Sequence, residues 1–283
     1  MAASSKTSRV WFITGASRGL GLAFTEAALA TGDRVVATAR TVSSLDQLAT
    51  ANGDRLLVLP MDVTDRAAVH DTVTAAVEHF GRLDIVVNNA GFLTMGTVEE
   101  FTEEQARAQM DTNFFGALWV SQEVLPQLRA QGSGHIVQIS SIGALGGFSL
   151  TGLYSASKFA LEGMSEALAA EAAGFGVKLT IVEPGGYWTD LYTTGLVTTE
   201  PNGVYAPLRA ELEKQFADNS VDSLPHLAAE ALLKLVNSHE PPLRLLLGSM
   251  IYDLAFDISR RRMATWASWE ETSRAAEQAV AAP

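Results

Sequence analysis

Tyr154 and Lys158 stand four residues apart in the segment YSASK. Residues at this spacing share one face of a helix, with their Cβ atoms roughly 6 Å apart. An ammonium group beside a phenol stabilises the phenolate and lowers its pKa from about 10 towards neutrality. The pair makes Tyr154 a candidate general acid or base for a carbonyl/alcohol couple, although a Tyr/Lys pair alone is also a common surface arrangement.

Ser140 and Ser141 come just after an apolar run over 134–139 that is typical of a strand. Either hydroxyl can hydrogen-bond the substrate oxygen on which Tyr154 acts. A serine hydrolase is not indicated, because no histidine is placed to serve as the base of such a site.

A glycine-rich turn over 14–21 (TGASRGLG) follows an apolar run over 10–13 and opens a helical pattern over 20–30. Glycines let backbone amides approach a pyrophosphate, and a helix N-terminus favours its negative charge. A tight turn without a ligand is the alternative, but the position between a strand and a helix favours dinucleotide binding. The candidate contacts within the turn are Gly15, Ser17, Arg18, Gly19, Leu20 and Gly21.

The end of the second apolar run bears on which dinucleotide is bound. A free ribose 2′-hydroxyl is usually held by an acidic residue about 20 residues beyond the glycines. Ala39 takes that place here, and Arg40 follows it. Arg40 and Arg18 can pair with a 2′-phosphate, whereas solvated surface arginines are the alternative for each taken singly. The sequence therefore favours NADP(H) over NAD(H).

These groups need a scaffold that brings distant segments together. Seven apolar runs predict strands over 10–13, 34–39, 56–59, 83–87, 134–139, 178–182 and 243–247. Helical patterns lie between them, and the one over 102–129 is interrupted near Asn113. The alternation predicts an α/β fold, a single Rossmann-type domain over 8–283 with a doubly wound parallel sheet of about seven strands and helices on both faces.

Two segments depart from this alternation. Residues 187–223 combine turn residues with mixed helix formers, and we expect them to form a substrate lid. Residues 249–283 read as a helical extension. Trp266 and Trp269 lie three residues apart on it, and we expect them to pin one face of this helix to the body of the protein.

The composition excludes several classes of function. The chain has 283 residues, with 20 Lys+Arg against 32 Asp+Glu and a formal net charge of −12. This acidity argues against nucleic-acid and anionic-membrane partners, which need clustered basic residues. Cysteine is absent, which excludes disulfides and thiol nucleophiles, and the 5 histidines lack a metal-binding spacing, so we expect no metal.

The sequence also bears on location. The N-terminus has no apolar signal core, and no stretch of 18 apolar residues occurs. We expect a soluble cytoplasmic protein that acts on a small molecule.

Seven segments occur in the order and at the spacing of one family. They are TGASRGLG (14–21), Asp62-Val63, NNAG (88–91), Asn113, ISS (139–141), YSASK (154–158) and PGGYWT (184–189), spread over roughly residues 8–250. By these segments the chain resembles the NADP(H)-preferring branch of the short-chain dehydrogenase/reductase family. The resemblance implies an oxidoreductase such as a carbonyl reductase (ketoreductase) or an alcohol dehydrogenase.

The resemblance implies catalytic roles for four residues. Tyr154 is the general acid/base, while Lys158 lowers its pKa and holds the nicotinamide ribose. Ser141, thirteen residues before Tyr154, matches the substrate-oxygen position better than Ser140. Asn113 completes a water-mediated proton relay to Lys158, for which a helix kink or cap is the alternative.

The same resemblance implies cofactor contacts beyond the glycine turn and Arg40. Asp62 accepts from the adenine amino group. Thr189 closes over the nicotinamide end, with the backbone of Tyr187 near the carboxamide. The implied set is Asp62, Val63, Asn89, Ala90, Gly91, Tyr154, Lys158, Pro184, Gly185 and Thr189.

Bulky residues near the lid depart from many members of this family. Tyr187 and Trp188 stand where smaller residues are frequent. With other apolar side chains they predict an aromatic-lined pocket for a hydrophobic ketone or secondary alcohol, although core or lid packing is the alternative for each. The predicted pocket residues are Phe92, Leu93, Phe148, Leu153, Tyr187, Trp188, Leu191 and Tyr192.

The sequence thus predicts an NADP(H)-dependent oxidoreductase that moves a hydride between the nicotinamide and a ketone or secondary alcohol. One alternative is an epimerase or dehydratase on the same scaffold, although such relatives generally carry a longer C-terminal domain. The other is a non-catalytic NADP(H)-sensing binder, although such proteins tend to lose the Tyr or the Lys. A homo-oligomer, dimer or tetramer, is expected through the helices over 113–129 and 157–173.

Overall fold

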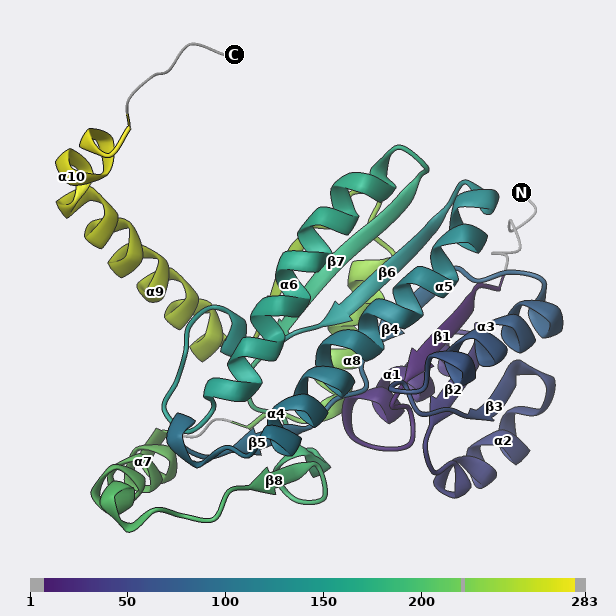
Figure 1. Cartoon of the computed structure of the whole chain (residues 1–283). Coiled ribbons are helices and arrows are strands. Elements are labelled where there is room, and N and C mark those ends of the chain that lie inside the picture. The colour runs from purple at the N-terminus through teal and green to yellow at the C-terminus, as the bar shows by residue number, and fades with distance from the viewer. Residues whose placement is uncertain (1–7, 220–221, 278–283) are drawn as a thin grey trace.

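A seven-stranded parallel sheet forms the centre of the computed structural model, which describes residues 8–219 and 222–277 (Figure 1). The strands are β1 (Val10–Thr14), β2 (Arg34–Ala39), β3 (Leu56–Pro60), β4 (Ile85–Asn88), β6 (Gly134–Ile139), β7 (Val177–Pro184) and β9 (Arg244–Leu247). Their order is β3-β2-β1-β4-β6-β7-β9, and every neighbouring pair is parallel. The predicted fold class is confirmed, and the carboxyl ends of all these strands lie at one edge of the sheet.

Helices cover both faces of this sheet. One face packs against α1 (Gly19–Ala30), α2 (Asp46–Asn52) and α8 (Pro225–Val236), and the other against α3 (Arg66–Phe80), α5 (Gly116–Gln131) and α6 (Gly152–Ala173). Within β1, Trp11 and Ile13 belong to the first core, whereas Val10 and Phe12 belong to the second. Because both faces are buried, the strands read as continuous apolar runs in the sequence.

The helix predicted over 102–129 is divided near Asn113. Helix α4 (Glu103–Met110) passes into a π-helical turn over Asp111–Phe115 before α5 begins. Asn113 is buried in this turn. A π-helical turn widens the helix locally and is frequent at functional sites.

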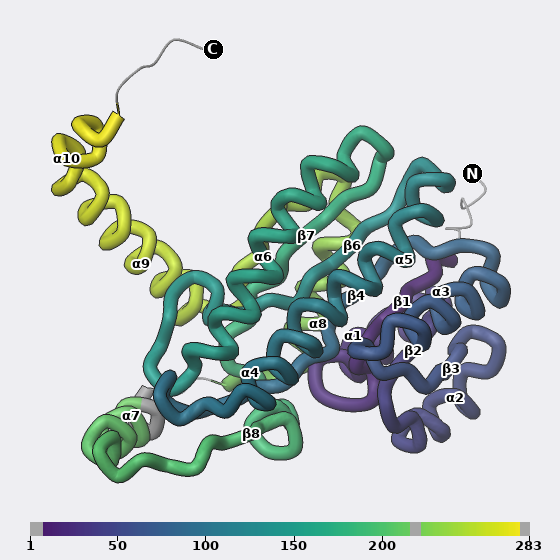
Figure 2. The backbone as a smooth tube through the Cα atoms, viewed as in Figure 1, coloured from purple at the N-terminus to yellow at the C-terminus, as the bar shows by residue number. Residues whose placement is uncertain are grey.

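The chain leaves the sheet after β7 and crosses its carboxyl edge before it returns at α8 (Figure 2). This excursion contains β8 (Leu196–Thr198) and α7 (Ala206–Asn219). Strand β8 pairs in parallel with β5 (Leu93–Met95), so the two form a small second sheet. The sequence does not predict it, because strands of three residues are too short to show a period.

Glu100 fastens the same excursion to the segment that follows β5. Its carboxylate accepts from the backbone N–H groups of Asn202 (2.7 Å) and Thr97 (2.8 Å) and pairs with Arg209. The hydrogen bond from Asn202 contributes most to lowering the pKa of Glu100 to about 2. Residues 220–221 of the expected lid lie outside the described residues.

The C-terminal helices α9 (Ser249–Ser268) and α10 (Glu270–Ala275) project away from the sheet (Figure 1). Ile251 and Ala255 near the start of α9 are buried. Trp266 and Trp269 are 64% and 63% exposed, so the prediction that they pin the helix to the body is wrong. The helix leaves the body before it reaches them, and residues 278–283 of the extension lie outside the described part of the chain.

Within residues 8–219 and 222–277, no helix combines the length and the apolar character needed to cross a bilayer.

Candidate active site

The turn between β1 and α1 is built from glycines where other residues do not fit. Gly15 and Gly19 have φ angles of +64° and +54°, in the left-handed region that favours glycine. A Cβ on Gly21 would lie 2.2 Å from the carbonyl oxygen of Gly15. Among the described residues no side chain caps the start of α1, and its first turn holds no acidic residue. The turn therefore fits a pyrophosphate, because no side-chain oxygen competes for the first N–H groups of α1.

Asn89 and Thr14 hold this turn against the end of β4. Asn89 Nδ2 donates to the carbonyl oxygens of Thr14 (2.9 Å) and Gly15 (3.1 Å). The backbone N–H groups of Asn89 and Ala90 both donate to Thr14 Oγ1, each at 3.0 Å. Two residues predicted to contact the cofactor thus lie directly against the glycine turn.

The two arginines predicted to hold a 2′-phosphate lie on the outer side of the turn. Arg40 is exposed directly after β2. The hydroxyl of Ser44 donates to the carbonyl oxygen of Ser17 (3.0 Å), which holds the segment after β2 against the turn. The Arg18 guanidinium donates to the hydroxyl of Thr194 in the excursion, so Arg18 is engaged there.

Asp62 and Val63 follow β3 at the same edge of the sheet. Asp62 Oδ1 accepts from the backbone N–H (3.0 Å) and the hydroxyl (2.9 Å) of Thr64. Val63 is buried against Gly116 at the start of α5, where a Cβ would lie 2.6 Å from Val63 Cγ2. Because β3 pairs with β2, both residues lie near the segment that carries Arg40.

Tyr154 and Lys158 project from the first two turns of α6 towards the end of β6. Ser141 lies close enough to Tyr154 to lower the pKa of its hydroxyl. Ser141 Oγ accepts from the backbone N–H of Gly143 (3.1 Å), which fixes the hydroxyl oxygen. Lys158 Nζ donates to the carbonyl oxygen of Ile139 (2.8 Å) and lies 5.6 Å from the centre of the Tyr154 ring. The structure brings the three predicted side chains together.

The ionisation of this pair differs from the expectation. Burial raises the pKa of Tyr154 to about 12, and the nearby side chain of Ser141 only partly offsets it. Burial lowers the pKa of Lys158 to about 8, against the opposing charge of Glu162. The expected fall of the Tyr154 pKa towards neutrality is therefore wrong for this structure, because desolvation of the phenolate is the largest contribution.

Asn113 is committed to fixing the backbone beside the site. Its Nδ2 donates to the carbonyl oxygen of Phe92 (3.0 Å) and to Ser157 Oγ (3.2 Å). Its Oδ1 accepts from the backbone N–H of Phe92 (3.1 Å) and would lie 3.2 Å from a Cβ on Gly91. The side chain thus joins the π-helical turn to α6 and to the segment after β4.

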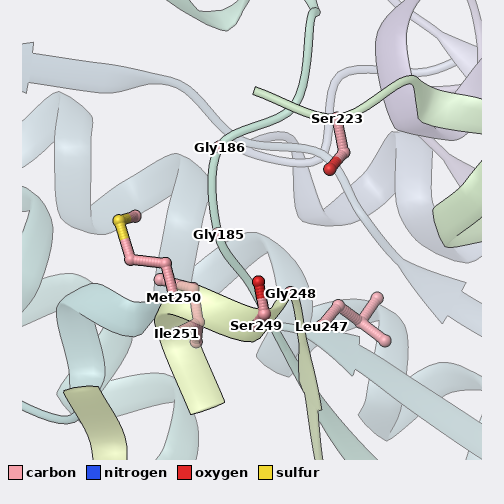
Figure 3. A pocket seen from close by; sticks show the side chains of 8 residues that line it. All are labelled: Gly185, Gly186, Ser223, Leu247, Gly248, Ser249, Met250 and Ile251. Atoms are coloured by element: carbon pink, nitrogen blue, oxygen red, sulfur yellow. The ribbon is translucent and has the colours of Figure 1, made fainter. Parts of the chain in front are cut away.

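The chain after β7 passes between the glycine turn and α9. Strand β7 ends at Pro184, and a Cβ on Gly185 would lie 2.4 Å from Ile251 Cγ1. Thr189 Cβ lies 3.2 Å from the position of a Cβ on Gly19, so Thr189 stands beside the glycine turn. A cavity of about 40 Å³ is lined by Gly185, Gly186, Ser223, Leu247, Gly248, Ser249, Met250 and Ile251 (Figure 3). It has room for a few water molecules and is too small for a hydrophobic ketone.

The predicted substrate pocket is not assembled as one surface. Tyr187 is buried in the core on the α1 face of the sheet. Trp188 is 69% exposed and lines a groove of about 530 Å³ between α1, the excursion and the start of α8. Neighbouring residues of an extended segment point to opposite sides, so the two cannot share one wall. Of the others, Leu93 is buried, Phe92, Leu153 and Leu191 are half-buried, and Phe148 and Tyr192 are exposed.

Three charged residues near Lys158 were not predicted. Glu162 and Glu183 are buried on α6 and β7, and both pair with Arg244 of β9. Glu183 directly follows the apolar run predicted as strand 178–182, and that position is the only signal the sequence offers. Glu162, one helical turn after Lys158, reads as an ordinary surface acid.

A doubly wound parallel sheet, with a glycine turn opening α1, defines a nucleotide-binding scaffold of the Rossmann type. Residues 9–196 match the family model described as short chain dehydrogenase. A curated relative, Oxidoreductase BOA17 of Botryotinia fuckeliana, is 40% identical over 271 residues, which cover 94% of this chain and 98% of that protein. The chain belongs to the short-chain dehydrogenase family, a family of oxidoreductases that use a nicotinamide cofactor.

Two solved structures extend this comparison. A short-chain dehydrogenase from Streptomyces avermitilis has a TM-score of 0.91 and 38% identity, covering 96% of this chain and 100% of its own. A short chain dehydrogenase from Burkholderia cenocepacia in complex with NADP has a TM-score of 0.73 and 27% identity, covering 92% of this chain and 97% of its own. The family resemblance therefore extends over the whole fold and not only over its motifs.

Proposed function

We propose that the protein is an NADP(H)-dependent reductase that converts a hydrophobic or aromatic ketone into a secondary alcohol, reversibly. The observation that carries the proposal is the meeting of three side chains at the carboxyl edge of the sheet. Gly143, whose N–H donates to Ser141 Oγ, lies against the Tyr154 ring, and Lys158 Nζ lies 5.6 Å from the centre of that ring. The proposed catalytic residues are Asn113, Ser141, Tyr154 and Lys158.

The residues of the chain divide the proton chemistry between them. The nicotinamide, when bound, supplies a hydride to the carbonyl carbon. The Tyr154 hydroxyl donates its proton to the carbonyl oxygen, which Ser141 orients by a second hydrogen bond. Because burial raises the pKa of Tyr154 to about 12, the phenol keeps its proton at neutral pH, as reduction requires. Lys158 holds the ribose hydroxyls through its ammonium group.

The preference for NADP(H) rests on charge at the end of β2. Ala39 leaves no carboxylate there to repel a 2′-phosphate, and exposed Arg40 supplies a planar donor pair for it. Arg18 reaches the same phosphate by exchanging its bond to Thr194. The NADP complex of the relative from Burkholderia cenocepacia supports the same preference.

The substrate site is proposed between α6, the segment after β5 and the excursion after β7. Half-buried Phe92, Leu153 and Leu191 and exposed Phe148 and Tyr192 offer it an apolar lining. Residues 187–223 act as the lid and 249–283 as a helical extension of one domain over 8–283, which assembles as a homo-oligomer.

The test is Tyr154→Phe, with Tyr252→Phe on α9 as the matched control on an exposed tyrosine outside the proposed site. Removing the acid should lower the rate of NADPH oxidation with an aryl ketone by about 10²–10⁴-fold. NADPH binding, followed by its fluorescence, should stay within about threefold of wild type. Normal turnover in Tyr154→Phe would show that another group transfers the proton.

A further inference from the structure

Lys158 lies on the same helix as Glu162, which belongs to a charged group with Glu183 and Arg244; Lys158 and the two glutamates are buried, and the Arg244 side chain is 35% exposed. Glu162 lies one turn further along α6, Glu183 lies near the end of β7, and Arg244 opens β9. Lys158 and Glu162 are each 5% exposed and Glu183 is 1% exposed. Removal of several charges from water is unfavourable unless they neutralise one another.

Arg244 joins the two buried carboxylates. Its guanidinium donates to Glu183 (2.7 Å) and to Glu162, and its other terminal nitrogen donates to the half-exposed Glu166 (2.7 Å). Ser140, the neighbour of Ser141, donates its hydroxyl proton to the other oxygen of Glu162 (2.5 Å). Glu162 therefore connects β9 to the end of β6.

Lys158 and Arg244 depend on Glu162 to different degrees. Arg244 meets three carboxylates, those of Glu162, Glu183 and Glu166, so it keeps two of them if Glu162 becomes neutral. Glu162 is the carboxylate that favours the charged form of Lys158, from one helical turn further along α6. A neutral Glu162 would therefore leave the Lys158 ammonium buried without that compensating charge, which favours loss of its proton.

Resting on the proposed function, we propose that Glu162, held in place by Arg244 and Ser140, is a positioning residue that keeps the Lys158 ammonium charged beside Tyr154. The other ionisable groups that the structure places against this group are Tyr154 and Glu166 on the same helix. Glu162 also holds Ser140, and through it the strand end that presents Ser141. A neutral Lys158 would hold the ribose hydroxyls less strongly and would no longer favour the phenolate that forms when Tyr154 gives up its proton.

The test measures the ionisation of Lys158 directly, without substrate or cofactor. NMR of the full-length protein with ¹³C-labelled lysine follows the Nζ-bonded carbon between pH 6 and 11. The other lysines of the chain are Lys6, Lys178, Lys214 and Lys234, so a Lys158→Arg variant assigns the signal. Glu162→Gln keeps the shape and removes the charge, Glu162→Asp keeps the charge, and Glu166→Gln removes the charge of the half-exposed partner of Arg244.

We expect Glu162→Gln to lower the midpoint of the Lys158 titration by about one pH unit or more. Glu162→Asp and Glu166→Gln should stay close to wild type. A structural role alone would make Glu162→Asp and Glu162→Gln equally unstable and would leave the midpoint where it is. An unmoved midpoint in a folded Glu162→Gln variant overturns the inference.

A second measurement separates the inference from the proposed function. The alkaline limb of the pH profile of NADPH oxidation should move to lower pH in Glu162→Gln, in step with the Lys158 titration. If the titration moves and the pH profile does not, the support of Lys158 by Glu162 stands and the proposed role of Lys158 in turnover fails. If neither moves, the inference fails.

Discussion

The two edges of the central sheet use charge in different ways. At the amino edge, each of two acids directly before a strand pairs with a nearby arginine. Asp33 accepts from Arg9 (2.8 Å) and from Trp11 Nε1 (2.9 Å), and Asp84 pairs with Arg82 and accepts the N–H of Val10 (2.8 Å). These bonds fix where β1, β2 and β4 begin.

At the carboxyl edge, the polar groups of the candidate site position the glycine turn and the reactive side chains rather than the start of a strand. The glycine turn is fixed by the amide of Asn89, which carries no charge. Burial moves the pKa of Tyr154 up to about 12 and that of Lys158 down to about 8. The amino edge thus uses ion pairs to fix the starts of strands, while the carboxyl edge holds reactive side chains whose pKa values are shifted by burial.

The largest expected effect is that of Gly21→Ala at the carboxyl edge. The new Cβ meets the carbonyl oxygen of Gly15, a backbone atom that cannot yield without opening the turn. NADPH binding should weaken by about 100-fold, and the protein should lose about 3 kcal/mol of stability. Fluorescence titration and urea denaturation measure the two effects. Gly163→Ala on α6, where a Cβ meets no atom within 4 Å, is the control and should change neither by much.

Asp33→Asn tests the amino edge and should act on stability alone. The variant leaves the Arg9 guanidinium half-paired in a buried setting, so the free energy of unfolding at pH 7 should fall by about 3 kcal/mol. Turnover per folded molecule should be unchanged. Glu103→Gln breaks an exposed i,i+4 ion pair with Arg107. It should lower the free energy of unfolding by less than about 0.5 kcal/mol. Equal losses in the two variants would remove the contrast between the edges.

The same variant carries a pH signature. Burial alone would raise the pKa of Asp33, but hydrogen bonds from Trp11 and Arg9 lower it below 3.8. The stability that Asp33 contributes is therefore complete above pH 3.8 and is lost as the pH falls through the folded-state pKa. The difference in free energy of unfolding between wild type and Asp33→Asn should therefore become smaller below pH 3.8. Urea denaturation at several pH values measures this difference.

The smallest expected effect is that of Arg40→Asp, which tests charge at the exposed border of the carboxyl edge. A carboxylate there repels a 2′-phosphate and accepts from a 2′-hydroxyl, so the preference for NADPH over NADH should fall by about tenfold or more. The ratio of kcat/KM for the two cofactors measures it, with Arg55→Asp, on the helical turn before β3, as the control. An unchanged ratio would contradict the 2′-phosphate contact of Arg40.

The sheet could be predicted because its strands are buried on both faces. A run such as Val10–Ile13 admits few other structures, and the turn residues after it mark the edge where a site forms. The pair Tyr154 and Lys158 could also be predicted from a local pattern, because residues four positions apart share one face of a helix.

Features that depend on tertiary contacts could not be predicted from the sequence. The opposite directions of Tyr187 and Trp188 follow from how the chain crosses the edge of the sheet. The rise of the Tyr154 pKa follows from burial that no spacing reveals. Glu162 and Arg244 pair although they are 82 positions apart. The residues around each of them in the sequence give no sign of this pairing.

The pairing of β5 with β8 has a consequence for anyone who recombines this protein with its relatives. The excursion between β7 and α8 is continuous in the sequence, so exchanging that one segment would replace all of it. In this protein, strand β8 of the excursion pairs with Leu93–Met95. The carboxylate of Glu100 also accepts from the backbone N–H of Asn202, further along the excursion. A transplanted excursion therefore needs residues 93–100 from the same donor, so that a chimera is spliced at two places in the gene rather than one.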